Sequence, residues 1–162
     1  MFNKFTNKSQ EAIINAQIIA QDHGQPQIEG VHILASLLSQ AESLVRPILE
    51  KMKISPDRIE DITYDEIEKM PKAMTSSSSI GTVQGTAEVA MLLERARKEA
   101  EKMEDEFIST EHIFLALLAS KSRAQDILLK AGLAYSEVAK RLSELRGSQK
   151  ITDPEPETKF RV

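Results

Sequence analysis

The chain has 162 residues, 41% of them hydrophobic and 28% charged, which is enough to build one ordinary soluble domain or two very small ones. Its net charge of −4, without a dense cluster of Lys and Arg, argues against a nucleic-acid surface. Because the chain has no Cys, disulfides, thiol chemistry and thiolate metal sites are excluded, and the composition fits a reducing compartment.

The start of the chain, residues 1–5 (MFNKF), lacks the apolar stretch of a signal peptide. Elsewhere the uninterrupted apolar runs are only a few residues long, far short of the roughly 20 residues that a membrane-spanning helix needs. We therefore expect a cytoplasmic protein that makes no membrane contact.

The sequence contains an internal duplication, which appears when the chain is shifted by 80 positions. Eight of the 33 positions from Thr6 to Leu38 are then identical. They are Thr6/Thr86, Ala16/Ala96, Ala20/Ala100, Ile28/Ile108, His32/His112, Ile33/Ile113, Leu37/Leu117 and Leu38/Leu118. Further along, a shift of 79 keeps the register. We interpret the chain as two copies of one repeat.

The first copy, about residues 6–69, is predicted to form four helices. Its first helix follows Thr6, an N-cap residue, and carries an apolar stripe at helical spacing. The stripe consists of Ile13, Ala16 and Ala20. The last helix is predicted to start at Ser55-Pro56, an N-cap followed by a proline at the first helical position.

Ile14 and Ile18 add a second apolar edge to the first helix, one turn apart. The other copy has Glu94 and Lys98 at these positions, a solvated pair. Two exposed isoleucines would each forgo about 1.5–3 kcal/mol of burial. We favour the hypothesis that they pack against the second copy; the alternative is an apolar surface for client polypeptides.

The second copy, about residues 86–147, is also predicted to form four helices. The first of these helices carries an apolar stripe at helical spacing, which consists of Val89, Leu92, Leu93, Ala96, Ala100 and Met103. Its third helix is expected over about 124–131, ending at Gly132, and its fourth over about 135–146, ending at Gly147.

The remaining segments read as linkers. Residues 70–85 are rich in Ser and Gly, which predicts a flexible connection. Residues 148–162 contain two prolines, cannot continue a helix and are expected to lead toward another domain. The predicted fold class is therefore all-α: two pseudo-symmetric four-helix repeats, eight helices in all, forming one domain over residues 1–147.

Few residues point to chemistry. No Gly-rich phosphate loop is present, so this segment is not itself an ATPase. His23, His32 and His112 are scattered and have no Cys partners, which argues against a zinc site. Because His32 and His112 are equivalent in the two copies, we expect them to pack or hydrogen-bond at the seam between the repeats.

Three positions have a structural interpretation beside a functional one. Thr6 can cap a helix. Glu111 lies in the first turn of a helix, where the helix dipole favours a carboxylate. Asp105 belongs to an acidic run that is typical of a solvated face.

Taken together, four segments resemble the Clp N-terminal domain family, which opens the ClpA, ClpB and ClpC unfoldases. They are residues 5–12 (FTNKSQEA), 28–34 (IEGVHIL), 108–118 (ISTEHIFLALL) and 151–157 (ITDPEPE). The resemblance covers nearly the whole chain, and the last segment is similar to the ClpB stretch that leads toward the first ATPase module.

The resemblance implies a non-catalytic domain that binds unfolded or aggregated polypeptide and passes it to an ATP-driven ring, expected to be hexameric. It places substrate-binding roles on Thr6, Leu93, Asp105, Glu111 and His112, with an apolar groove beside them. Arg95 and His112 stand where some relatives have apolar groove residues, which predicts a smaller or more polar groove.

For this segment we therefore expect no cofactor and no metal, with ATP and magnesium confined to ATPase modules outside it. The expected partners are unfolded clients and those modules. The alternative, typical of protease-linked relatives, is a docking domain for a specific folded adaptor protein.

Overall fold

The computed structural model describes residues 4–73, 84–147 and 149–157, and within these ranges the chain is helical apart from one short pair of strands. The first repeat supplies α1 (Asn7–Asp22), α2 (Gly30–Ser39), α3 (Val45–Lys51) and α4 (Pro56–Lys69). The second supplies α5 (Ala87–Lys102), α6 (Thr110–Ala119), α7 (Arg123–Lys130) and α8 (Tyr135–Arg146). The predicted all-α class with two four-helix repeats is confirmed. Most of the predicted linker, residues 74–83, lies outside the described part of the chain.

Side-chain caps determine where several helices begin. The hydroxyls of Thr6, Ser55 and Thr86 each accept a hydrogen bond from the backbone N–H three residues further on. Pro56 then occupies the first helical position of α4, where its missing N–H costs nothing. The helix starts predicted at Thr6 and Ser55 are therefore correct.

Equivalent helices of the two repeats end in the same left-handed turn. After α1 and α5 the left-handed residues are Gly24 (φ 68°) and Glu104 (φ 59°). After α3 and α7 they are Lys53 (φ 63°) and Gly132 (φ 94°). The two repeats thus share the same backbone conformation at these turns. In each pair only one residue is glycine, the residue that the left-handed conformation favours.

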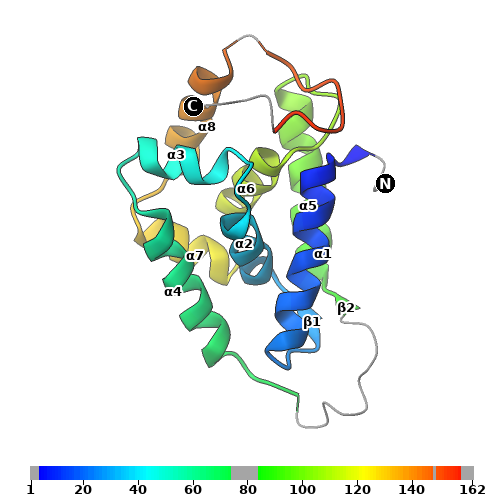
Figure 1. The fold of residues 1–162 in the computed structure, drawn as a ribbon, viewed down its shortest axis with the longest axis vertical. Helices are drawn as coiled ribbons and strands as arrows, with labels where there is room; N and C mark the ends of the chain where they lie inside the picture. Colours follow the sequence, from blue (N-terminus) through cyan, green and yellow to red (C-terminus); the bar gives the residue numbers. More distant parts are fainter. Residues whose placement is uncertain (1–3, 74–83, 148, 158–162) are drawn as a thin grey trace.

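The core is centred on α2 and α6, the second helix of each repeat (Figure 1). Nine of the ten residues of each helix are buried, so neither has a solvent-facing side. The buried apolar residues of both repeats form one continuous cluster around this pair. The two repeats therefore share a single core.

Backbone pairing joins the repeats reciprocally. The strand β1 (Gln27–Ile28) of the first repeat pairs in parallel with β2 (Gln84–Gly85), which leads into the second. Phe5, at the start of the first repeat, forms a parallel bridge with Ile108 of the second. Phe5 is the counterpart of Gly85 and Ile108 is the counterpart of Ile28, 80 positions apart in each case. The bridge between Phe5 and Ile108 is therefore equivalent to the pair formed by Gly85 and Ile28, with the two repeats exchanged.

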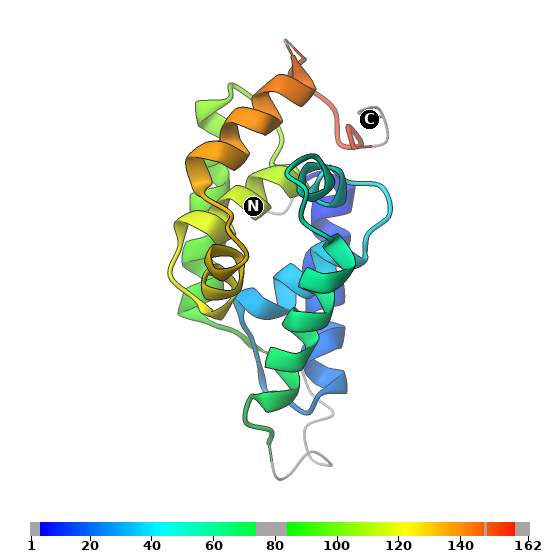
Figure 2. The same cartoon turned by 90° about the vertical axis from the view of Figure 1, so that its left-hand side faces the viewer.

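Residues 149–157, which we call the C-terminal tail, fold back onto the domain. In both views the tail lies over the end of the molecule where α1 begins (Figures 1 and 2). Backbone bonds anchor it there, for example from Asn7 N–H to the Pro154 carbonyl at 2.8 Å. This docking is a feature that the sequence analysis did not predict.

We expect Lys53→Gly and Glu104→Gly each to raise the free energy of unfolding by about 0.5–1 kcal/mol, because both side chains occupy a left-handed turn. Urea unfolding followed by circular dichroism measures the change. The matched control, Glu101→Gly within α5, should lower stability by about 1 kcal/mol. No gain at either turn position would contradict the assigned backbone.

Candidate functional site

The candidate site lies where the start of α1 meets the loop of residues 105–109 that precedes α6. The Thr6 N–H donates to the Ile108 carbonyl at 3.0 Å, and the Ile108 N–H donates to the Lys4 carbonyl at 2.7 Å. These bonds bring the N-terminal ends of α1 and α6 together. The backbone N–H groups of both helix ends therefore converge on one place.

Thr6 is fully buried at this junction. Its Oγ1 accepts a hydrogen bond from the Ser9 N–H at 3.1 Å, which is the predicted capping role. The same hydroxyl donates to Glu157 Oε2 at 2.7 Å. Thr6 thus links the helix cap to the C-terminal tail.

His112, also fully buried, orders the start of α6. Its Nδ1 accepts the Ser109 N–H at 2.8 Å, so the ring proton belongs on Nε2, which lies 2.8 Å from Asp105 Oδ2. The predicted hydrogen-bonding role is confirmed. Both hydrogen-bond partners belong to the same repeat as His112, but the loop that they hold is bonded to the start of α1 in the other repeat, so His112 lies beside the seam without a hydrogen bond of its own across it.

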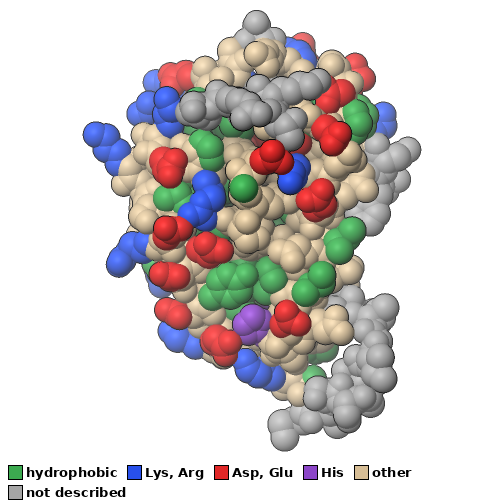
Figure 3. All heavy atoms as spheres, in the orientation of Figure 1, with side chains coloured by type: hydrophobic (Ala, Val, Ile, Leu, Met, Phe, Trp, Pro, Cys, Tyr) green, Lys and Arg blue, Asp and Glu red, His purple; other side chains and the backbone are tan. Residues whose placement is uncertain are grey.

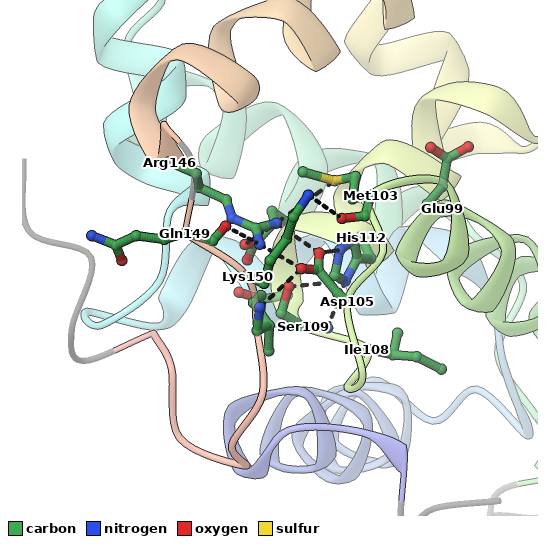
Figure 4. Close-up of polar contacts among 12 residues, drawn as sticks. Glu99, Met103, Asp105, Ile108, Ser109, His112, Arg146, Gln149 and Lys150 are labelled. Atoms are coloured by element: carbon green, nitrogen blue, oxygen red, sulfur yellow. Dashed lines mark hydrogen bonds and ion pairs between the residues drawn. The ribbon is translucent and has the colours of Figure 1, made fainter.

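Asp105 is the centre of a buried ionic cluster (Figure 4). Its side chain is 0% exposed, so the prediction of a solvated face is wrong for this residue: after the left-handed turn at Glu104 the chain points Asp105 inward. Arg146 at the end of α8 donates to both carboxylate oxygens, at 2.6 and 2.8 Å. Burial disfavours the Asp105 charge, but the bonds from His112 and Arg146 outweigh burial and hold its pKa well below the usual range.

The first repeat has a neutral version of this cluster. His32 Nε2 lies 2.6 Å from Gln25 Oε1, and Gln25 Nε2 donates to the Ile67 carbonyl at 2.7 Å. Gln25 is the counterpart of Asp105, and Ile67 is that of Arg146. Burial lowers the pKa of His32 to about 4, so this ring is neutral at pH 7. The charged pair is therefore a property of the second repeat alone.

The C-terminal tail is held against the cluster by its backbone. The Ile151 N–H donates to Asp105 Oδ1 at 2.9 Å, and the Ile151 carbonyl accepts the Glu106 N–H at 2.8 Å. Further on, the Pro154 carbonyl accepts the Asn7 N–H at the start of α1. The tail therefore crosses from the Asp105 loop to the first helix.

Glu157 ends the tail inside the site and is only 3% exposed. Its Oε2 accepts bonds from the Thr6 hydroxyl and from the Thr110 N–H, the latter at 3.2 Å. Burial and the charge of Glu111 raise the pKa of Glu157 to about 7. Glu111 itself is 1% exposed, and neither of its oxygens has a hydrogen bond to another described residue. Its ionic partner is Arg146, 3.6 Å away.

The site therefore unites four of the predicted residues, Thr6, Asp105, Glu111 and His112. Leu93 lies apart from them, in the middle of α5, partly buried against the core. Ile14 and Ile18 are 53% and 47% exposed on α1, so the favoured hypothesis that they pack against the second repeat is wrong.

Arg95, predicted to make the groove more polar, takes part in a polar cluster on α5. Its Nε donates to Glu99 Oε2 at 2.8 Å, and its guanidinium lies 5.6 Å from the centre of the Tyr135 ring. The Tyr135 hydroxyl donates to Glu99 as well. This part of α5 thus presents paired polar groups.

Arg146 and Glu157 are the site residues that sequence reasoning missed. A signal for Arg146 was present, since it is a cation in the last turn of a helix whose counterpart, Ile67, is apolar. Glu157 had no such signal, because two prolines predict only the absence of a helix.

The site is a closed network of polar contacts. Ser109 Oγ lies 3.0 Å from His112 Nδ1, and His112 Nε2 lies 2.8 Å from Asp105 Oδ2, but Ser109 and His112 are both 0% exposed, so this hydroxyl does not face a ligand from solvent. Among the described residues no group of three or more His, Cys, Asp or Glu side chains could hold a metal ion. None of the helices in the described ranges has the length and apolar character needed to cross a membrane.

We expect Arg146→Ile to lower stability by about 3–5 kcal/mol, because it leaves Asp105 buried without its cation. Adding Asp105→Gln reproduces the neutral pair Gln25 and Ile67 of the first repeat. The double variant should therefore be at least about 1 kcal/mol more stable than the sum of the single changes. Denaturant unfolding measures the cycle, with exposed Glu101→Gln as the control; strict additivity would contradict a coupled pair.

Comparison with known proteins identifies the family. The model of the Clp repeat (R) N-terminal domain matches residues 4–131. Chaperone protein ClpB of Bacteroides thetaiotaomicron is 35% identical over 159 residues, and that of Bacillus cereus is 32% identical over 158. Each alignment covers 98% of this chain and 18% of the relative, so the chain spans about a fifth of the length of these proteins.

Solved structures agree on the fold. The Hsp104 N-terminal domain from Candida albicans superimposes with a TM-score of 0.82 at 23% identity, covering 95% of this chain and 99% of that one. The N-domain of ClpV from Vibrio cholerae gives a TM-score of 0.71 at 20% identity, covering 88% of this chain and 85% of that one. The family model matches well over half of the chain, and the eight helices of the described ranges have the arrangement of the Clp N-domains. The chain therefore belongs to the Clp repeat N-terminal domain family.

Proposed function

We propose that this chain is the polypeptide-binding N-terminal domain of a ClpB-type disaggregase, and that it has no catalytic role of its own. The observation that carries the proposal is the exposure of Ile14 and Ile18, one turn apart on α1. Isoleucines that remain half exposed on one face of a stable helix are suited to weak contacts with apolar segments of an unfolded chain.

The surroundings of the two isoleucines support weak and unselective binding. Their exposed neighbours on α1 include the uncharged Gln17 and Gln21. Apolar side chains also gather on the face of the molecule that carries α1 and α4, with charged groups around them (Figure 3). Such a surface accepts many apolar sequences without specifying one.

The similarity to ClpB supports a proposal for the rest of the parent protein. ATPase modules would lie beyond this segment, bind ATP and magnesium, and assemble into a hexameric ring. This domain would then collect unfolded or aggregated polypeptides and present them to the ring in the cytoplasm.

A second candidate function is docking of a specific folded adaptor. A groove of about 810 Å³ lies between α4 of the first repeat and α7 of the second. Ile62 and Ile127 contribute apolar surface to it, and Arg58 and Lys130 contribute charge. A ClpV N-domain of the same fold has been solved in complex with a VipB peptide, so a Clp N-domain can bind a defined partner.

Ile14→Gln combined with Ile18→Gln should weaken the binding of fluorescently labelled β-casein, a generic unfolded protein, by roughly 30-fold. The estimate takes about 1 kcal/mol per half-exposed isoleucine. The melting temperature should change little, because these side chains are not part of the core. Fluorescence anisotropy and thermal unfolding measure the two effects.

Leu129→Gln is the control, since Leu129 is 50% exposed on α7. It should leave casein binding unchanged. An unchanged casein affinity in the isoleucine variant would refute the proposed surface. In a competition experiment, excess casein should displace a bound client; failure to displace a bound partner would favour the adaptor hypothesis.

A further inference from the structure

The C-terminal tail lies between the Asp105 loop and the start of α1 in the way that a bound peptide would, and we call the surface that it covers the groove. Ile151 contributes both its N–H and its carbonyl to the loop at Asp105 and Glu106, and Pro154 contributes its carbonyl to the start of α1. Backbone groups of this kind are common to every polypeptide. Contacts through them hold an extended segment irrespective of most of its sequence.

Three side chains of the tail are buried against the domain. Ile151 is 0% exposed, and Glu157, six positions later, is 3% exposed, with the buried Pro156 directly before it. The Glu157 carboxylate reaches the Thr6 hydroxyl and the Thr110 N–H. Between them, Thr152, Pro154 and Glu155 point into solvent. The groove therefore distinguishes an apolar residue followed, six positions later, by a carboxylate.

The first repeat fills the equivalent position permanently. There Glu88 of α5 accepts the Gly30 N–H at the start of α2, at 2.6 Å. Gly30 is the counterpart of Thr110, but the counterpart of Glu88 is Lys8, which cannot accept a hydrogen bond. The N–H of Thr110 must therefore find its carboxylate outside the two repeats, and the tail supplies it.

The fit of the tail is incomplete at its acidic end. Glu157 Oε1, both oxygens of Glu111 and the Thr110 hydroxyl are buried and have no hydrogen-bond partner among the described residues. In the described part of the chain, two carboxylates, Glu157 and Glu111, share this enclosed site, and the Arg146 guanidinium lies 3.6 Å from Glu111. Buried polar groups without partners are costly, so a segment that ends this way is held less firmly than its contacts suggest.

We propose that the groove between the Asp105 loop and the start of α1 is a peptide-binding site, and that the C-terminal tail is its built-in occupant, which clients displace. The ligand is an extended polypeptide segment with an apolar residue and, six positions later, a glutamate. This inference rests on the proposed binding of unfolded clients and specifies where one part of a client binds. It also explains why Thr6, Asp105, Glu111 and His112 are buried although the family resemblance gives them substrate-binding roles.

Hydrogen exchange on the whole chain tests whether Glu157 holds the tail. Asn7 and Thr110 each occupy the first position of a helix, where an amide has no partner within the helix, so the tail alone protects them. Glu157→Ala should speed exchange of both amides at pH 7.5 at least tenfold. Glu155→Ala, an exposed acid in the same tail, is the control and should leave both rates unchanged.

Glu157→Gln separates the hydrogen bonds from the charge. The amide oxygen can accept the bonds from Thr6 and Thr110 without repulsion from Glu111, so this variant should keep both amides protected. Equal loss of protection in the Gln and Ala variants would contradict the assigned bonds.

Binding in trans tests the groove itself. A fluorescein-labelled peptide with the sequence of residues 149–157 (QKITDPEPE) should bind the Glu157→Ala chain about tenfold more tightly than the wild type, where the tail competes. The same peptide with alanine at its last position should bind neither. Equal, undetectable binding of the first peptide to both chains would overturn the inference.

β-Casein connects the groove to clients. If the tail is docked about nine-tenths of the time, its release in Glu157→Ala should raise casein affinity about tenfold. An unchanged casein affinity beside lost amide protection would overturn displacement by clients and leave the proposed function intact. No casein binding by any variant would refute the proposed function, while the peptide experiment would still decide whether the groove exists.

Discussion

The organisation of this domain depends on reciprocal backbone bonding between its two repeats. The Thr6 N–H donates to the Ile108 carbonyl, and the Thr86 hydroxyl donates to the Ile28 carbonyl. Thr6 and Thr86 are equivalent residues 80 positions apart, and so are Ile28 and Ile108. Each repeat thus begins against the loop that precedes the central helix of the other. The link at Thr6 brings the starts of α1 and α6 to one place. A buried helix end needs partners for its free N–H groups, and at this junction each repeat lies beside the helix end of the other. Neither repeat could form the junction alone.

Divergence of the duplicated frame makes the two repeats structurally different around their central histidines. The first repeat satisfies its central histidine with Gln25, whereas the second uses Asp105 and a buried Arg146. In the second repeat, Asp105 Oδ1 accepts the backbone N–H of Ile151, and the N–H of the next residue, Glu106, donates to the Ile151 carbonyl. Pro26, which follows Gln25, has none. Only the second repeat can therefore hold an extended chain in this way.

Local rules predicted much of the fold from the sequence. Capping at Thr6 and Ser55 depends on a few neighbouring residues, and the left-handed turn at Gly132 depends on a missing side chain, so both were visible in the sequence. The favoured burial of Ile14 and Ile18 was wrong because helical periodicity does not specify how two repeats are oriented. Docking of Glu157 could not be predicted either, since it joins residues 47 and 151 positions apart through a site that exists only after folding.

The central claim is that part of a client binds at the junction of α1 and α6, and that the equivalent place in the first repeat does not bind it although the frame is duplicated. The most direct test is a titration of the isotope-labelled chain with unlabelled β-casein, followed through backbone amide chemical shifts. We predict that Asn7 and Thr110 shift strongly, while their counterparts Ala87 and Gly30 hardly move. Equal shifts at the two sets, or shifts confined to the groove between α4 and α7, would contradict the account.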